Sequence, residues 1–267
     1  MYRLVFCDLD GTLATHEGVV RPAVQEAMRA VAQSGAYITL CTSRGYQKVT
    51  PFLPQIAVNA PLVCCNGALV VEAHTKRVYH LAPMPLALAQ DLLRLAQEEG
   101  IEMHFFLDDM ETMLENRGDV RRFVLSRDGA ILRGVGDPVA ALRRPPHKVF
   151  IMSSTTESLP EVMERVKLAV GDRARVLTTS PRGIDVILPG ISKAEGMTCV
   201  ARIVGVEQAQ TLAVGDADND VEMLAWAGMG IAMGNASPAA KAAADWIAPS
   251  VQEDGRAVVL RRYVLSA

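Results

Sequence analysis

Short apolar runs alternate with helical spacings along the first eighty residues of the chain. The run within Arg3–Leu13 predicts a buried strand, after which Pro22 begins a helix that Gly35 ends. A second apolar strand is predicted within Ala36–Arg44, and it stops at small polar residues. The stretch Pro61–Val71 then predicts two strands joined by a turn at its Asn-Gly dipeptide. This alternation of strands and helices is typical of a doubly wound α/β sheet.

The pattern changes near residue 84 and returns near residue 189. Between these points the chain predicts two helices and several strands, which together make an α+β unit of about a hundred residues. The predicted helices are Leu86–Glu99 and Leu159–Val170, and the predicted strands are Ile101–Leu107, Glu111–Asn116, His147–Ser154, Ala174–Ser180 and Gly183–Pro189. We therefore predict an inserted domain at residues 84–188.

The first pattern resumes at Ser192, which is predicted to cap an amphipathic helix. A strand then ends in the acidic stretch Gly215–Asp220, and further helices follow, including one over Ser237–Ile247. The predicted fold is therefore α/β, with a parallel-sheet core formed by residues 1–83 and 189–267 around the inserted α+β domain.

Composition and charge restrict the class of protein. The net charge of −3 gives no reason to expect a nucleic acid or an anionic membrane as a partner. The five cysteines lie mostly in apolar runs and form no C-x-x-C pattern, which predicts reduced thiols. No apolar stretch is long enough for a membrane span, so we expect a soluble, cytoplasmic protein. The sequence says nothing about its oligomeric state.

Candidate chemistry gathers where the predicted strands end and the following helices begin. Two acids, Asp8 and Asp10, follow the first strand one residue apart, and residues i and i+2 of an extended chain face the same side. Like charges held this close repel each other, so a bound cation is the expected compensation. Sites in open α/β sheets form at the carboxyl ends of the strands. Further candidates at this edge are Thr42, Ser43, Arg44, Lys193, Asp216, Asn219 and Asp220.

These residue types suit the cleavage of a phosphate ester. That reaction needs a nucleophile in line with the leaving oxygen and cations that neutralise the phosphoryl oxygens. A carboxylate can act as the nucleophile, and a second acid can protonate the leaving group and then deprotonate water. Carboxylates also suit Mg²⁺, while lysine, hydroxyl and amide groups suit the phosphate.

The stretches "DLDGTL", "TSR", Lys193 behind a capping Ser192, and "GDADND" together resemble the haloacid dehalogenase superfamily of phosphatases. The downstream "GMGIAMGNASPAAKAAADWIAPSVQEDGRAVVL" is similar to its Cof-like branch. In that branch a large α/β cap lies between the second and third motifs, which is where the insert at residues 84–188 lies. The resemblance covers both halves of the core.

The resemblance implies a role for each matching residue. Asp8 resembles the nucleophile, Asp10 the general acid/base whose backbone carbonyl binds the metal, and Lys193 the residue that neutralises the nucleophile and the phosphate. The matches to the phosphate-binding and metal-binding residues are Thr42, Ser43, Asn219, Asp216 and Asp220, of which Asp220 is a ligand or an outer-shell acid. The implied metal set is thus Asp8, Asp10, Asp216 and Asp220, with Mg²⁺ as the cofactor. The implied reaction is hydrolysis of a small phosphorylated metabolite through an aspartyl-phosphate.

A departure from the family pattern at Ser43 matters little, whereas one at Asp185 affects what can be carried over. Ser43 stands where relatives commonly have Gly, and Asp185 stands in the cap where relatives often have Glu. Because cap residues select the substrate, the shorter acid leaves specificity open. Arg44 and Arg182 either contact the substrate or lie on the solvated surface.

Several alternatives were weighed against this hypothesis. Two kinds of alternative stay open. One is a phosphosugar mutase or a dedicated sugar-phosphate phosphatase of the same superfamily, and the other is a non-catalytic phospho-ligand-binding module. An EF-hand at residues 216–227 is excluded because Val221 and Ala227 occupy positions that need Gly and Glu. A nicotinamide-dependent oxidoreductase would depend on the glycines of Gly228–Gly234 alone, whose spacing is wrong for a dinucleotide loop.

Overall fold

The computed structural model describes residues 2–15, 17–107, 113–115 and 142–266. The chain divides into two compact units. The first unit is Met1–Thr42, Phe52–His80 and Ser192–Ala267, and the second is Ser43–Pro51 and Leu81–Ile191. The second unit therefore takes in the segment Ser43–Pro51, which the sequence had placed in the core, together with a few residues on either side of the predicted 84–188 insert.

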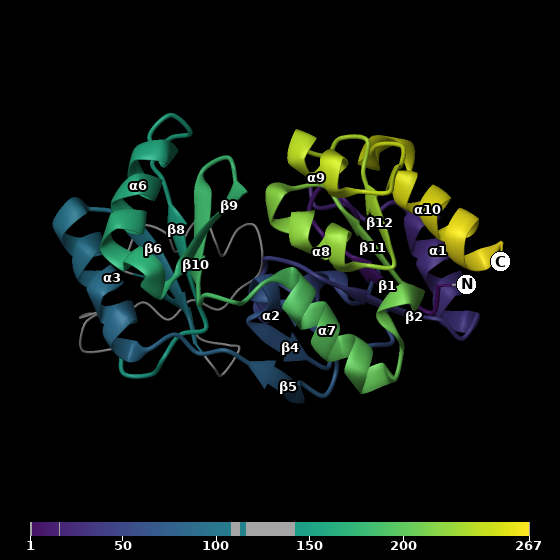
Figure 1. Cartoon of the computed structure of the whole chain (residues 1–267), viewed down its shortest axis with the longest axis horizontal. Helices are drawn as coiled ribbons and strands as arrows, with labels where there is room; N and C mark the ends of the chain where they lie inside the picture. Colours follow the sequence, from purple (N-terminus) through teal and green to yellow (C-terminus); the bar gives the residue numbers. More distant parts are fainter. Residues whose placement is uncertain (1, 16, 108–112, 116–141, 267) are drawn as a thin grey trace. The chain divides into compact units, whose positions relative to one another are not determined.

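A five-stranded parallel sheet forms the centre of the first unit (Figure 1). Its strands are β1 (Leu4–Cys7), β2 (Tyr37–Leu40), β11 (Thr211–Gly215), β12 (Met229–Ala232) and β13 (Trp246–Ile247). Their order is β13–β12–β11–β1–β2, and every neighbouring pair is parallel. The predicted α/β fold with a parallel sheet is confirmed. Strand β1, which precedes the first pair of acids, lies inside this sheet between β11 and β2.

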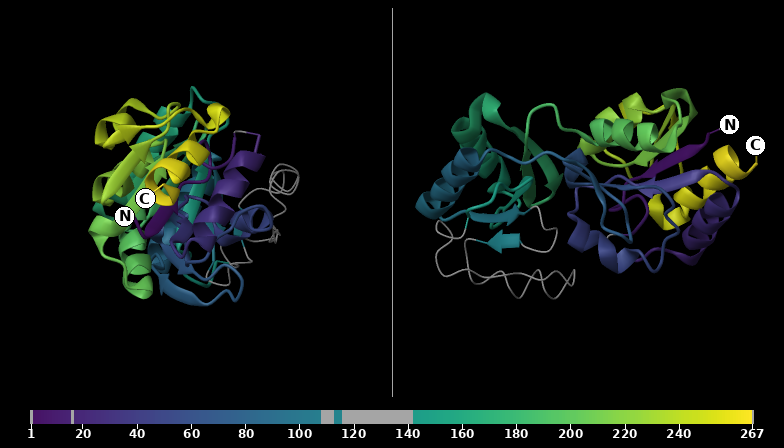
Figure 2. Two further views of the ribbon diagram at one scale, coloured as in Figure 1. Left: turned by 90° about the vertical axis from the view of Figure 1, so that its right-hand side faces the viewer. Right: turned by 90° about the horizontal axis from the view of Figure 1, so that it is seen from below.

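Helices cover both faces of this sheet. The helices are α1 (Pro22–Gln33), α7 (Lys193–Val204), α8 (Val221–Trp226), α9 (Pro238–Ala243) and α10 (Gly255–Leu260). Phe6 of β1 belongs to the apolar cluster that includes residues of α7, α8 and α9. The next side chain, Cys7, points to the other face, where it contacts Arg256 of α10. Figure 2 shows α10 beside α1, with which it packs.

Two local predictions have different outcomes. The predicted turn at Asn66-Gly67 is confirmed, since β3 (Leu62–Cys64) and β4 (Leu69–Val71) pair antiparallel around it. A third strand, β5 (Val78–Leu81), completes this small sheet. The predicted helix over Ser237–Ile247 is wrong at its end, because α9 stops at Ala243 and Trp246–Ile247 pairs with β12.

The second unit is an antiparallel sheet with helices on one face (Figure 1). Its strands are β6 (Glu102–Phe106), β7 (Met113–Glu115), β8 (Lys148–Met152), β9 (Arg175–Ser180) and β10 (Gly183–Ile187), in the order β7–β6–β8–β10–β9. Helices α3 (Leu86–Glu99) and α6 (Leu159–Val170) cover the apolar face, and the short α2 (Tyr46–Val49) belongs to the added segment. The predicted strand at 111–116 lies partly outside the described residues.

The other face of this sheet carries polar and aromatic side chains. Because side chains alternate along a strand, the residues between the core positions point away from α3 and α6. They include His104, Phe106, Lys148, Phe150 and Asp185.

All five cysteines are free, as predicted, and four of them are buried. In the part of the chain that the structure describes, no helix has both the length and the apolar character needed to cross a membrane.

Candidate active site

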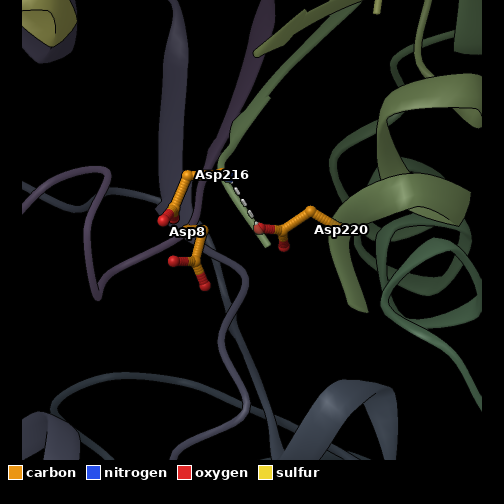
Figure 3. Close-up of side chains that lie close together, drawn as sticks. All are labelled: Asp8, Asp216 and Asp220. Atoms are coloured by element: carbon orange, nitrogen blue, oxygen red, sulfur yellow. Dashed lines mark hydrogen bonds between the residues drawn. The ribbon is translucent and has the colours of Figure 1, made fainter. Parts of the chain in front are cut away.

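Two acids meet because their strands are neighbours in the parallel sheet. Asp8 directly follows β1 and Asp216 directly follows β11, and the Asp8 amide donates to Val214 O at 2.9 Å. Figure 3 shows these two carboxylates together with that of Asp220. One carboxylate oxygen from each of the three lies within 4.8 Å of the others. The acids far apart in sequence therefore converge at the carboxyl ends of the strands, as predicted.

Lys193 enters this cluster from the first turn of α7. Ser192 caps the helix as predicted, with its hydroxyl accepting from the Glu195 amide at 3.3 Å. The Lys193 Nζ lies 2.6 Å from Asp8 Oδ1 and 2.5 Å from Asp220 Oδ1. The lysine is only 1% exposed. It therefore joins two acids from different segments within a site that is shielded from water.

Asp220 has both of its carboxylate oxygens engaged. Oδ1 contacts Lys193, while Oδ2 accepts from the amides of Asp216 and Ala217 at 2.9 and 3.0 Å. The carboxylate also lies against the backbone at Gly215, where an added Cβ would be 2.5 Å from Asp220 Cγ. This arrangement suits a residue that holds the loop after β11 and orients Lys193.

Burial and repulsion by neighbouring acids raise the pKa of two of the carboxylates, Asp8 and Asp216. For Asp8, burial and the neighbouring charges of Asp220, Asp216 and Asp10 outweigh the opposing effect of Lys193 and hold its pKa well above the usual range. Burial, together with Asp220, raises the pKa of Asp216 to about 6. Burial alone would lower the pKa of Lys193, but Asp220 and Asp8 raise it above its ordinary value. The site thus holds an excess of negative charge.

Asp10 lies outside the buried group of acids. Strand β1 ends at Cys7, so the alternation expected for Asp8 and Asp10 does not extend to the second acid. Asp8 is buried, whereas Asp10 is exposed. The next residue, Gly11, has a φ of +80° and passes so close to Asp216 that an added Cβ would lie 2.4 Å from Oδ2. The chain therefore turns sharply beside the acidic cluster and leaves Asp10 accessible to solvent.

The predicted phosphate-binding residues fall in both units. Thr42 is buried in the first unit, where its amide donates to Val63 O at 2.9 Å. Asn219 lies in the same unit and donates through Nδ2 to Asn66 Oδ1 at 2.9 Å. Ser43 and Arg44 belong to the second unit, in which Arg44 Nη1 donates to Lys48 O at 3.3 Å.

Two side chains contact Asp216 to which sequence reasoning assigned no role, although Thr12 belongs to a strand-end segment that it singled out. Thr12 Oγ1 donates to Asp216 Oδ1 at 2.7 Å, and Asn235 Nδ2 lies 3.4 Å from Oδ2. Asn235 also donates to Gly11 O at 2.8 Å. Thr12 is part of the "DLDGTL" stretch, and Asn235 follows the end of β12, so the rule that sites form at strand ends was the signal available for both.

The donor set fits a hard divalent cation. Carboxylate oxygens are the ligands that Mg²⁺ prefers, and it takes one or two of them together with water and phosphate. Asp8 and Asp216 offer such oxygens side by side. Burial, together with the charges of neighbouring acids, raises the pKa of each, and a bound cation would oppose that shift. Asp220 belongs to the same group of acids, but its oxygens already have partners within the protein.

Comparisons with known proteins agree with this geometry. The profile of the haloacid dehalogenase-like hydrolase family matches residues 5–260. Pyridoxal phosphate phosphatase YbhA of Escherichia coli is 30% identical, over 91% of this chain and 92% of its own. The 5-amino-6-(5-phospho-D-ribitylamino)uracil phosphatase YitU of Bacillus subtilis is 26% identical, over 97% of each chain.

A solved structure shows the same fold. The crystal structure of a haloacid dehalogenase-like hydrolase from Bacteroides thetaiotaomicron superposes with a TM-score of 0.88 at 22% identity, covering 98% of this chain and 99% of that one. The resemblance seen in the four sequence motifs is confirmed, and the chain belongs to the haloacid dehalogenase-like hydrolase family.

Proposed function

We propose that this chain is a Mg²⁺-dependent phosphatase that hydrolyses small phosphorylated metabolites through an aspartyl-phosphate intermediate. One observation carries the proposal: Asp8, Asp216 and Asp220 converge at adjacent strand ends around the buried Lys193. This gives a nucleophile, a cation and a place for a metal ion within one cluster. Two relatives of the chain are named as phosphatases, and the convergent acids supply the groups for that chemistry.

The metal would be held by the carboxylates of Asp8 and Asp216 and by the backbone carbonyl of Asp10. When bound, Mg²⁺ neutralises phosphoryl oxygens and draws charge away from the leaving group. Asp220 positions the site rather than binding the metal, since one of its oxygens contacts Lys193 and the other accepts from the backbone after β11.

The reaction has two steps that the protein's own side chains carry. The Asp8 carboxylate attacks phosphorus, a P–O bond forms to Asp8, and the P–O bond to the substrate alcohol breaks. Asp10 gives its proton to the departing alkoxide. Asp10, now ionised, takes a proton from water, whose oxygen attacks phosphorus, so that inorganic phosphate leaves and Asp8 is regenerated. The exposure of Asp10 and the burial of Asp8 suit these roles, because a proton carrier needs access to water.

Binding of the phosphoryl group falls to the remaining candidates. Lys193 fixes the Asp8 carboxylate through Oδ1 and places a positive charge beside it. Thr42, Ser43 and Asn219 supply neutral donors, and Arg44 supplies a second charge for the substrate.

The inserted domain is proposed as the cap that selects the organic part of the substrate. The names of two relatives contain pyridoxal phosphate and a phosphoribitylamino-uracil, so related chains act on small phosphomonoesters of different shape. In this chain Asp185 is fully buried and lies 2.8 Å from Lys148 Nζ. It acts on substrate choice by fixing that lysine on the polar face of the cap sheet.

The test uses Asp8→Asn, which keeps the shape of the side chain and removes the nucleophilic charge. With Mg²⁺ and an aryl phosphate, phosphate release should fall on the order of 10⁴-fold or more, while circular dichroism shows an unchanged fold. A variant that keeps its turnover would refute the assignment of Asp8.

The same assay separates the hydrolase from a mutase. A phosphatase releases inorganic phosphate without an isomerised sugar phosphate, whereas a mutase returns the phosphoryl group to the sugar. A wild-type protein that binds phosphate but releases none from any phosphomonoester would instead indicate a binding module.

A further inference from the structure

The turn between β3 and β4 has an unusual backbone. Cys65, Asn66 and Gly67 are consecutive residues with φ values of 53°, 54° and 98°. Residues with a Cβ rarely occupy this region, because the Cβ crowds the carbonyl oxygen of the backbone. Two such residues in a row persist only where the surrounding structure compensates, and this is frequent at functional sites.

Contacts of this turn reach three segments of the candidate site. Asn66 is 1% exposed, and its backbone amide donates to Thr42 O at 3.1 Å. Its side-chain oxygen accepts from Asn219 Nδ2 at 2.9 Å. Gly67 passes so close to the start of α7 that an added Cβ would lie 2.0 Å from Ser192 O. The turn therefore touches the segments that carry Thr42, Asn219 and Lys193.

The hydrogen bond between Asn66 and Asn219 fixes the orientation of the Asn219 side-chain amide, and therefore whether its nitrogen or its oxygen is available to a ligand. An amide nitrogen carries two hydrogens, so Asn219 Nδ2 can donate one to Asn66 Oδ1 and keep one for an anion. If the Asn219 amide were flipped, its carbonyl oxygen would face the Asn66 oxygen, and the two acceptors would repel each other. An acceptor at Asn66 Oδ1 thus favours the orientation in which Asn219 is a donor.

We propose that Asn66 is a positioning residue for phosphoryl-group binding, which orients the Asn219 amide through its side chain and fixes Thr42 through its backbone. This inference rests on the proposed function, in which Thr42 and Asn219 contact the phosphoryl group. It also gives a reason for the strained turn, because the left-handed backbone there presents the Asn66 amide to Thr42 and its side chain to Asn219.

The decisive variant is Asn66→Gly, since glycine accepts the left-handed backbone and removes only the side chain. Its thermal stability should match or exceed that of the wild type, while inorganic phosphate, used as a competitive inhibitor, should bind about tenfold more weakly. The kcat/KM for an aryl phosphate should fall by a similar factor. The matched control is Lys76→Gly, at an exposed residue with a φ of 58° in the β4–β5 turn. It should change neither constant.

A double-mutant cycle with Asn219→Ala tests whether Asn66 acts through Asn219. Asn219→Ala should itself weaken phosphate binding, and adding Asn66→Gly should then cost much less than it does in the wild type. Full additivity, or unchanged phosphate affinity in Asn66→Gly, would overturn the inference. If the wild type hydrolyses no phosphomonoester and Asn219→Ala leaves phosphate binding intact, the proposed function fails instead.

A measurement on the wild type needs no variant at position 66. The side-chain NH₂ protons of Asn219 can be assigned by their absence from the spectrum of Asn219→Ala. Because one of them is bonded to Asn66, it should exchange with water more slowly than a free asparagine amide. Exchange at the free rate would contradict the proposed orientation.

Discussion

Two buried lysines, one in each unit, meet carboxylates in contrasting ways. Lys193 in the core contacts Asp8 and Asp220, and Asp216 belongs to the same group of acids. Among the described residues, Lys148 in the inserted domain pairs with a single acid, Asp185.

Lys148 also contacts a backbone carbonyl and two aromatic rings. Its Nζ donates to Ser43 O at 2.6 Å and lies 5.0 Å from the ring centre of Phe106 and 5.7 Å from that of Phe150. In the part of the chain that the structure describes, the positive charge is thus matched by the Asp185 carboxylate, a carbonyl dipole and two aromatic faces.

The difference between the two clusters is one of charge balance. Three carboxylates face one ammonium around Lys193, whereas Lys148 and Asp185 form a pair of equal and opposite charges. An uncompensated buried charge is expensive, so a fold that keeps one has a ligand or a reaction that uses it. The core cluster is therefore expected to act in the chemical step, whereas the pair in the inserted domain is expected to hold the cap structure that selects the substrate and to have little effect on the chemical step.

The largest expected effect comes from applying the same substitution to both lysines. Lys193→Met removes the charge that holds Asp8, so kcat for an aryl phosphate should fall roughly 10²–10³-fold. Lys148→Met should lower kcat by less than about tenfold and should act mainly on stability. Steady-state kinetics at saturating Mg²⁺ measure both. Equal losses of kcat in the two variants would remove the functional distinction between the clusters.

A second comparison replaces one acid in each cluster by its amide and measures unfolding in metal-free buffer. Asp185→Asn leaves Lys148 without its counter-charge and should destabilise the protein by roughly 3–5 kcal/mol. Asp216→Asn relieves repulsion within the core cluster and should stabilise it by about 1 kcal/mol. Thr12 can still donate to the amide oxygen at position 216, so that contact survives the change.

The two substitutions are expected to change the free energy of unfolding in opposite directions, so comparing them is informative. Urea denaturation gives both free energies of unfolding. If Asp216→Asn destabilises the metal-free protein as much as Asp185→Asn does, the core cluster carries no excess of charge.

Sequence alone predicted the parts of the site that depend on strand ends and helix caps. Asp8 and Asp216 were found because an acid directly after an apolar run lies at the edge of a parallel sheet. Lys193 was found because Ser192 caps its helix and because the family motif includes it. These signals are local, and the fold that brings them together could be predicted from the alternation of strands and helices along the sequence.

Contacts between single polar residues could not be predicted in the same way. Thr12 meets Asp216, and Asn66 meets Asn219, across more than 150 residues of chain, and no periodic pattern marks such pairs. The predicted C-terminal end of the helix that became α9 was wrong for a related reason. Trp246 and Ile247 continue an alanine-rich run with good helix propensity, but pairing with β12 overrides that local preference.

A further expected effect, the binding of Mg²⁺ itself, addresses the reason for the charge excess. A ligand that binds only the native state stabilises it by about 2.7 kcal/mol at a hundred times its Kd, which is roughly 5–10 °C in Tm for a chain of this size. Wild-type protein should show this shift when Mg²⁺ is added after chelation, and Asp216→Asn should lose most of it. Asp185→Asn starts from a lower Tm but should shift by the full amount, because its acid lies outside the core cluster. Equal shifts in all three proteins would mean that Mg²⁺ acts as a general salt, and the unbalanced acids around Lys193 would then need another partner.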